Sequence, residues 1–113
     1  MNNVDVCLSP ELIHLFDLNK KVVVVIDIFR ATSVICTALN CGIKEIIPIS
    51  DLAQLNEFDK KDFLIAAERD GKIVPGFKFG NSPLHYLNNP EIKGKKLVLT
   101  TTNGTRAINL SKN

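Results

Sequence analysis

The chain has 113 residues, of which 45% are apolar and 23% charged, proportions typical of an ordinary globular domain. Its 14 basic and 12 acidic side chains give a net charge of +2, and their scatter excludes the basic stripe of a nucleic-acid-binding protein. The longest apolar run, Val22–Ile26, is too short to span a membrane. The three cysteines form no CxxC pair and the sequence opens without a signal peptide, so we expect a cytoplasmic protein.

The first part of the chain predicts two strands and a long helix. Val4–Leu8 alternates apolar and polar residues, which favours a short strand, and Ser9 then begins a helix-start signal. Val22–Ile26 is a continuous β-branched run, which predicts a central strand buried on both faces. Apolar residues then recur at helical spacing over Ala31–Leu39, and Gly42 supplies the C-terminal stop.

Apolar runs in the rest of the chain predict further strands at Ile43–Ile49, Phe63–Ala67 and Lys95–Thr100. Ser50–Phe58 predicts a short helix, residues 69–83 a long irregular loop, and Asn103-Gly104-Thr105 the start of a last helix. Strands that alternate with helices predict an α/β fold, a mainly parallel sheet covered by helices on both faces in three layers. Because the last helix stops after about two turns, we expect residues 1–113 to be the N-terminal α/β portion of a C-terminally truncated domain. Homo-oligomer formation is left open.

Three polar clusters follow predicted strands, at residues 27–33, 68–71 and 100–106. In open parallel sheets, ligands bind beyond the carboxyl ends of the strands, where loops lead into helices. If the strands are parallel, the three clusters converge on one rim. The sequence therefore predicts one binding site at this edge.

The side chains of these clusters suit an anionic ligand bound with a metal ion. Asp27 and Glu68 are hard oxygen donors suited to Mg²⁺. Arg30, Arg69 and Arg106 are planar forks that match phosphate or sulfonate oxygens. The turn at residues 101–105 adds hydroxyl groups and free backbone N–H groups at a helix N-terminus.

Each of these residues also has a purely structural interpretation. Asp27 could cap the helix that follows it, and Arg30 or Arg106 could be a surface helix charge. Glu68 and Arg69 could form a rim ion pair, and the threonines of the third cluster could simply favour strand geometry. The binding interpretation depends on the equivalent positions of the three clusters.

Four stretches of the sequence resemble the 2-phosphosulfolactate phosphatase family, and they occur in the family's order. They are VVIDIFRATS at residues 24–33, AER at 67–69, GFKFGNSP at 76–83 and LTTTNGTRA at 99–107. The resemblance implies Mg²⁺-dependent hydrolysis of (2R)-2-phospho-3-sulfolactate to 3-sulfolactate and phosphate, a step in coenzyme M biosynthesis. Family members are substantially longer than this chain. The resemblance also gives meaning to Asn81 and Ser82, which would offer polar groups to the substrate, or else form a self-satisfied turn.

From the side-chain chemistry at these positions we assign the catalytic roles to Asp27, Arg30 and Glu68, with Asp27 and Glu68 holding the metal. We assign substrate binding to Thr32, Arg69, Asn81, Ser82, Thr101, Thr102, Asn103, Gly104, Thr105 and Arg106. The expected ligand is a small phosphorylated or sulfonated acid.

Three other functions compete with this interpretation. A haloacid-dehalogenase-type phosphatase would need Asp-x-Asp, but Phe29 occupies the second position. An isochorismatase-like hydrolase would use a Cys after a late strand, and no Cys here follows one. A non-catalytic module for small phosphorylated or sulfonated acids explains the arginines but not the two carboxylates, which would repel an anion unless a cation intervened.

Overall fold

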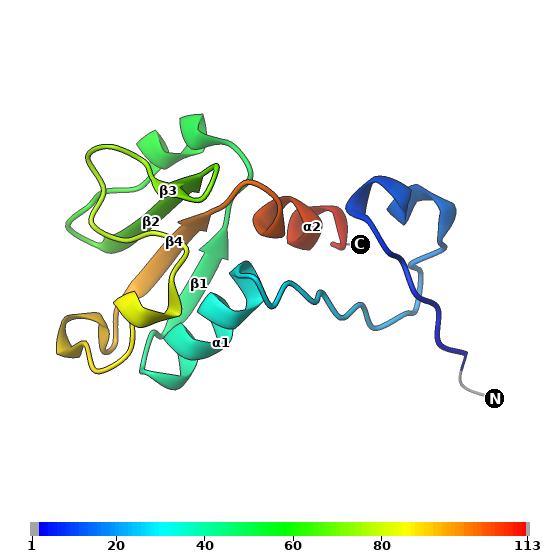
Figure 1. The fold of residues 1–113 in the computed structure, drawn as a ribbon, viewed down its shortest axis with the longest axis horizontal. Coiled ribbons are helices and arrows are strands. Elements are labelled where there is room, and N and C mark those ends of the chain that lie inside the picture. Colours follow the sequence, from blue (N-terminus) through cyan, green and yellow to red (C-terminus); the bar gives the residue numbers. More distant parts are fainter. Residues whose placement is uncertain (1–2, 113) are drawn as a thin grey trace.

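A four-stranded sheet forms the centre of the protein in the computed structural model, which describes residues 3–112 (Figure 1). Its strands are β1 (Glu45–Pro48), β2 (Phe63–Arg69), β3 (Lys72–Ile73) and β4 (Lys96–Thr100), in the order β1-β4-β2-β3. Strands β1, β4 and β2 are parallel, and β3 runs antiparallel to β2. The predicted α/β fold with a mainly parallel sheet is therefore correct.

The register of the parallel strands brings their carboxyl ends to one edge. Glu45 and Phe63 both pair with Lys96, and at the other end Ala67 pairs with Thr100. The residues that follow, Glu68 near the end of β2 and Thr101 just after β4, consequently lie next to each other at this edge. This alignment places the candidate site.

Within the described residues, two α-helices and four 3-10 helices accompany the sheet. The α-helices are α1 (Ala31–Asn40) and α2 (Gly104–Leu110), and the 3-10 helices are η1 (Pro10–Leu15), η2 (Leu52–Glu57), η3 (Pro83–His85) and η4 (Pro90–Ile92). The predicted helices are thus present, the one after Ser50 as the 3-10 helix η2 capped by Asp51. Within residues 3–112, none of the helices is sufficiently long and apolar to cross a lipid bilayer.

Apolar side chains cover both faces of the sheet. On one face, Val34 and Ala38 of α1 pack with Leu97 and Leu99 of β4, together with the buried Tyr86. On the other face, Leu55 of η2 packs in a second cluster with Ile49, Ile65, Ala67 and Val98. Alternate residues of β4 thus point to opposite clusters, as the period of a strand requires. The predicted three-layer arrangement follows from this alternation.

A tight hairpin interrupts the loop that the sequence predicts at residues 69–83. Arg69 pairs with Lys72 across the two-residue turn Asp70-Gly71, whose φ angles are 52° and 78°. Two central residues with positive φ are what a type I′ turn requires, and Asp-Gly is a favoured pair for it. The prediction of a wholly irregular loop was wrong because it did not use this turn signal.

The two strands predicted nearest the N-terminus are absent from the structure. Val4–Leu8 and Val22–Ile26 belong to no strand within residues 3–112, and Val22 is 93% exposed. Val22–Ile26 lies in an extended link between η1 and α1, outside the sheet (Figure 1). An apolar run indicates that a segment suits burial on both faces. It does not indicate that a neighbouring strand is available to pair with the segment. The prediction of a buried central strand at this position was wrong.

Candidate active site

A pocket of about 310 Å³ lies at the carboxyl edge of the parallel strands. It brings together eight of the predicted site residues, namely Asp27, Arg30, Glu68, Asn81, Thr101, Thr102, Asn103 and Gly104. The prediction that Asp27, Glu68 and Thr101 share one edge of the sheet is confirmed, while the roles assigned to them remain predictions. Five others do not line the pocket, namely Thr32, Arg69, Ser82, Thr105 and Arg106.

A second hollow, of about 380 Å³, lies where η1 approaches α2 and shares no lining residue with the first. Its only titratable side chains are His14 and Asp17. It contains no arginine and no second carboxylate, so it lacks the groups that anion or metal chemistry would require. The smaller strand-end pocket is the better candidate site.

Asp27 is held at its place by the first turn of α1. Its backbone N–H donates to Thr32 Oγ1 at 2.8 Å, and its carbonyl accepts from Thr32 N at 3.0 Å. Thr32 was assigned to the substrate, but its hydroxyl oxygen instead accepts this backbone hydrogen bond. On the far side, a Cβ at Gly104 would collide with Ala31 Cβ and come within 2.8 Å of Asp27 Oδ2. Gly104 therefore lets α2 approach α1 closely beside this carboxylate.

Glu68 is a buried carboxylate, only 5% exposed, that joins three segments. Its Oε1 accepts from the Gly71 amide at 2.6 Å and from Thr102 Oγ1 at 3.1 Å. Its Oε2 accepts from Asn81 Nδ2 at 3.4 Å. Within residues 3–112, Glu68 forms no ion pair with a basic side chain. Buried charges in proteins are normally paired or bound to a metal, so a cation in the pocket would offset the charge of this carboxylate.

Many of the polar groups in the turn between β4 and α2 form hydrogen bonds with one another. Thr101 and Thr105 exchange backbone-to-hydroxyl hydrogen bonds at 3.1 and 3.2 Å, and Thr105 Oγ1 also donates to the Thr101 carbonyl. Thr105 is fully buried and contributes to the turn rather than to the pocket. Thr102 donates to Glu68, which leaves Asn103 and Gly104 as the lining residues free of these bonds.

Of the three predicted guanidinium groups, only that of Arg30 belongs to a pocket-lining residue. The Arg69 guanidinium donates to the Glu68 carbonyl at 2.6 Å, the Thr100 hydroxyl at 2.9 Å and the Ser50 carbonyl at 3.2 Å. It therefore ties β2 to β4 and to the end of β1. These bonds direct the donors of Arg69 toward the protein, and its assignment as a substrate ligand stays a prediction.

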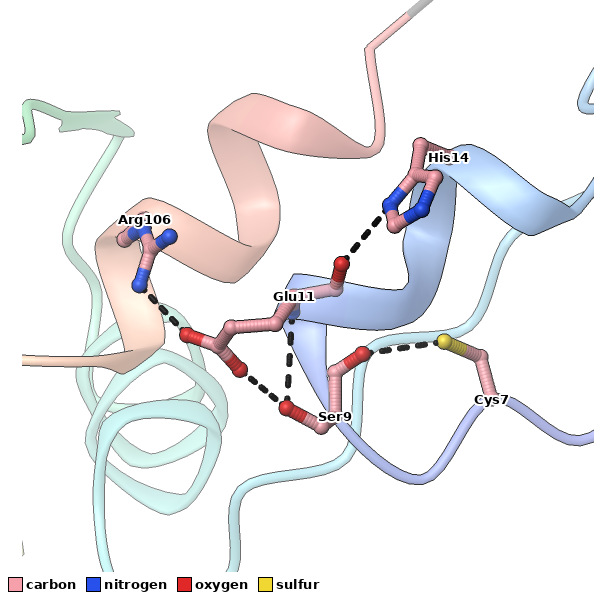
Figure 2. Close-up of polar contacts among 5 residues, drawn as sticks. All are labelled: Cys7, Ser9, Glu11, His14 and Arg106. Carbon is pink, nitrogen blue, oxygen red and sulfur yellow. Dashed lines mark hydrogen bonds and ion pairs between the residues drawn. The ribbon is translucent and has the colours of Figure 1, made fainter.

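Arg106 lies outside the pocket, in a surface network between α2 and η1. Figure 2 shows its guanidinium directed at Glu11, with Arg106 Nη1 2.5 Å from Glu11 Oε1. The other oxygen of Glu11 accepts from the Ser9 hydroxyl, and the Ser9 hydroxyl accepts from the Glu11 N–H. The Ser9 hydroxyl, the Glu11 backbone and Arg106 lower the pKa of Glu11 from 4.5. Both charges are half exposed, and the assignment of Arg106 to the substrate stays a prediction.

Three lining residues, Phe29, Asp70 and Gly71, lie within the predicted clusters but received no role from the sequence. Asp70 is a third carboxylate at the pocket, placed there by the β2–β3 hairpin, and its N–H donates to Thr102 Oγ1 at 3.1 Å. The Asp-Gly turn signal could have located it. Ser82, which was assigned to the substrate, is half-buried at the N-cap of η3 and makes no side-chain cap bond there.

The pocket thus has more carboxylates than guanidinium groups. Asp27, Glu68 and Asp70 line it with Arg30 as the single basic side chain. Such a surface repels a phosphate or sulfonate by itself, but it attracts a divalent cation that an anion can then join. The arrangement suits a phosphorylated ligand bound through a metal ion.

Comparison with known proteins is consistent with this chemistry. A family model described as 2-phosphosulpholactate phosphatase matches residues 7–113. A protein of Caldanaerobacter subterraneus subsp. tengcongensis, named probable 2-phosphosulfolactate phosphatase, is 53% identical over 97 residues, or 81% of this chain and 39% of its own. Proteins of the same name from Clostridium tetani and Clostridium novyi are 44% and 45% identical, over 94% and 93% of this chain and 46% of their own. The chain spans less than half the length of these relatives.

Proposed function

The chain belongs to the 2-phosphosulfolactate phosphatase family, and we propose that it hydrolyses (2R)-2-phospho-3-sulfolactate to 3-sulfolactate and phosphate with the help of Mg²⁺. One observation carries the proposal. Glu68 is buried without a basic partner in a pocket that Asp27 and Arg30 also line. A carboxylate pair beside a guanidinium suits phosphoryl transfer far better than it suits simple anion binding.

The residues of the pocket fit Mg²⁺. This ion takes one or two carboxylates and completes its shell with water and substrate phosphate oxygens. Asp27 and Glu68 supply the two carboxylates, and the buried Oδ1 of Asn81 has no hydrogen-bond partner. Within the described residues, no group of three His, Cys, Asp or Glu side chains converges as a metal site. The proposed site therefore relies on two carboxylates and on the oxygens of the substrate.

Arg30 is the protein's own contribution to anion binding. The substrate carries phosphate, sulfonate and carboxylate groups, and Arg30 is the basic side chain that lines the pocket. Its planar fork binds two anionic oxygens at once. Mg²⁺, when bound, supplies positive charge that neutralises phosphoryl oxygens. Asn103 and Gly104 line the pocket at the start of α2 and orient the ligand there.

Phosphate release tests the proposal directly. The chain is incubated with 2-phospho-3-sulfolactate with and without Mg²⁺, and free phosphate is measured. We expect release only when Mg²⁺ is present. Binding of the substrate by calorimetry without any release would instead support a non-catalytic module for phosphorylated and sulfonated acids.

Replacing Asp27 by Asn provides a sharper test of the same site. The amide keeps the shape and the backbone bonds to Thr32 but removes a charge, so activity should fall by about a hundredfold or more while the far-ultraviolet circular dichroism stays unchanged. Asp62→Asn, an exposed change outside the pocket, is the matched control. Near-normal turnover in the Asp27 variant would remove Asp27 from the mechanism.

We further propose that the reaction serves coenzyme M biosynthesis in the cytosol. The three cysteines are free thiols, which suits a reducing compartment. Deletion of the gene should then lower the cellular coenzyme M content, and an unchanged content would refute this assignment.

A further inference from the structure

Asn81 has the one buried side-chain oxygen or nitrogen atom without a hydrogen-bond partner within residues 3–112. The residue lines the strand-end pocket, is 7% exposed, and directly follows Gly80 in the segment that leads into η3. Its Nδ2 donates to Glu68 Oε2 at 3.4 Å, and its Oδ1 is the atom left over. Leaving a buried acceptor unsatisfied costs about 1–3 kcal/mol. Such an atom in a native pocket calls for a ligand.

The bond to Glu68 determines which atom of the amide is the oxygen. Reversing the amide would set Oδ1 against the Glu68 carboxylate, with two acceptors facing one another and no proton between them. Nδ2 therefore faces Glu68, and Oδ1 is an acceptor beside an acidic group. It is the side-chain atom of Asn81 that has no hydrogen bond, while Nδ2 already donates one of its two N–H groups to Glu68.

The chemistry of Oδ1 excludes a direct contact with the ionised substrate groups. Phosphate, sulfonate and carboxylate oxygens are acceptors, as Oδ1 is, so the two would repel. A carbonyl oxygen can instead be satisfied by a hard divalent cation, which takes amide oxygens along with carboxylates. The neighbouring Glu68 carboxylate, which has no basic partner, requires the same kind of positive charge.

We propose that Asn81 Oδ1 is a ligand of the divalent cation held by Glu68, a role that the sequence analysis did not assign to it. The identity of the ion as Mg²⁺ rests on the proposed function. At 3.4 Å the hydrogen bond between Asn81 and Glu68 is long and weak, so an ion that reaches both side chains displaces little. Asn81 then adds a third protein oxygen to the metal ligands that Asp27 and Glu68 supply.

Binding of Mn²⁺ to the 113-residue chain, without substrate, tests this ligand. Mn²⁺ prefers the same octahedral oxygen sites as Mg²⁺, and its binding is followed by calorimetry and by its paramagnetic resonance signal. Asn81→Leu removes the oxygen at similar size, and we expect affinity to fall by about tenfold or more. Asn81→Asp keeps an oxygen at the site and adds a charge, so its affinity should equal or exceed that of the unmodified chain. Asn56→Leu, an exposed change on η2, is the matched control and should bind normally.

The thermal stability of the Asp variant gives a second readout. Without metal its new carboxylate lies beside Glu68, so its melting temperature should fall, and Mn²⁺ should raise it by more than in the unmodified chain. If Asn81→Leu fails to fold by circular dichroism, the Asp variant decides. Unchanged Mn²⁺ affinity in Asn81→Leu, or equal losses in the Leu and Asp variants, would overturn the proposal.

The same titrations separate this proposal from the function. An unmodified chain that binds no Mn²⁺ would refute both the ligand and the metal dependence of the reaction. The expected Mn²⁺ pattern together with no phosphate release would refute the phosphatase activity alone and leave the Asn81 ligand standing.

Discussion

Arg30 and Arg106 are both predicted anion ligands by sequence, but the structure separates them. Arg30 lines the strand-end pocket, whereas Arg106 pairs with Glu11 on the surface. A charge-assisted hydrogen bond is worth about 1.5–3 kcal/mol. We therefore expect Arg30→Ala to weaken binding of sulfolactate by roughly one to two decades and Arg106→Ala to leave it unchanged. Calorimetric titration of the product, in the presence of Mg²⁺, measures both.

The two variants serve as controls for each other, because each removes one guanidinium and one positive charge. Equal losses would indicate that the summed charge of the protein, and not the pocket, attracts the ligand. A loss confined to Arg106→Ala would return this residue to the binding site and contradict the geometry described here.

Glu11 predicts a specific pH dependence of stability. The Ser9 hydroxyl, the Glu11 backbone and Arg106 lower the pKa of Glu11 in the folded state from 4.5. Ionised Glu11 therefore stabilises the fold above pH 4.5, and this stabilisation disappears as the pH falls through the lowered pKa. Between neutral pH and about pH 3, the chain should lose more stability than its Glu11→Gln variant. Urea denaturation at the two pH values measures the difference.

Glu57→Gln is the matched control for this experiment. Glu57 ends η2 on the exposed surface, where the same change should leave the acid-induced loss as it is in the unmodified chain. An identical loss in Glu11→Gln and the unmodified chain would show that η1 is held on α2 without the help of this carboxylate.

At the scale of elements, the approach of α2 to α1 depends on the missing side chain of Gly104. A methyl group there would collide with Ala31 Cβ and crowd Asp27 Oδ2. Overpacking of this kind typically costs about 1–3 kcal/mol, so Gly104→Ala should lower the free energy of unfolding by that amount. Urea denaturation followed by circular dichroism measures it.

A second substitution identifies which contact is responsible. Ala31→Gly removes the colliding methyl group, so the double variant should recover part of the lost stability, and a double-mutant cycle gives the coupling. The contact between the methyl group that Gly104→Ala introduces and Asp27 Oδ2 is present in both the single and the double variant. Both should therefore bind Mn²⁺ more weakly than the unmodified chain. Additive losses in the two variants would show that the helices do not meet at this point.

The elements that could be predicted from the sequence are those whose apolar pattern is local. β1, β2, β4 and α1 each appear where an apolar run or a helical stripe lies, because burial on the two sheet faces selects these patterns. The hairpin strand β3 is two residues long and carries no such pattern. Its one signal is the turn pair Asp70-Gly71, which the prediction of a single irregular loop over residues 69–83 did not use.

The candidate site could be predicted in position but only partly in composition. Parallel strands with aligned carboxyl ends bring Glu68 and Thr101 together, and strand-end reasoning needs no more than that. The direction of a long side chain depends instead on residues distant in the sequence. Arg69 donates to Thr100, 31 positions away, and Arg106 pairs with Glu11, 95 positions away. These contacts have no local signature.

For the whole molecule, the main departure from expectation is the N-terminal region. Six large apolar side chains between Val4 and Ile26 are more than 70% exposed, namely Val4, Val6, Leu8, Val22, Val24 and Ile26. η1 packs on α2, and the link that follows it leads to α1 without joining the sheet (Figure 1). The sheet and its pocket are built from Asp27 and the residues that follow it, so the pocket has no lining residue from the expected strand.

The exposed run Val22–Ile26 has a consequence for how the chain behaves at high concentration. Five β-branched residues without charge or proline, extended and outside any sheet, form a template for intermolecular β-pairing and aggregation. Val24→Lys places a charge in this template and should lower light scattering in concentrated solution. Leu84→Lys adds the same charge at similar exposure, 76% against 74%, on η3 and should have little effect. Equal suppression by both variants would attribute the scattering to net charge, and the run would then be an inert part of the surface.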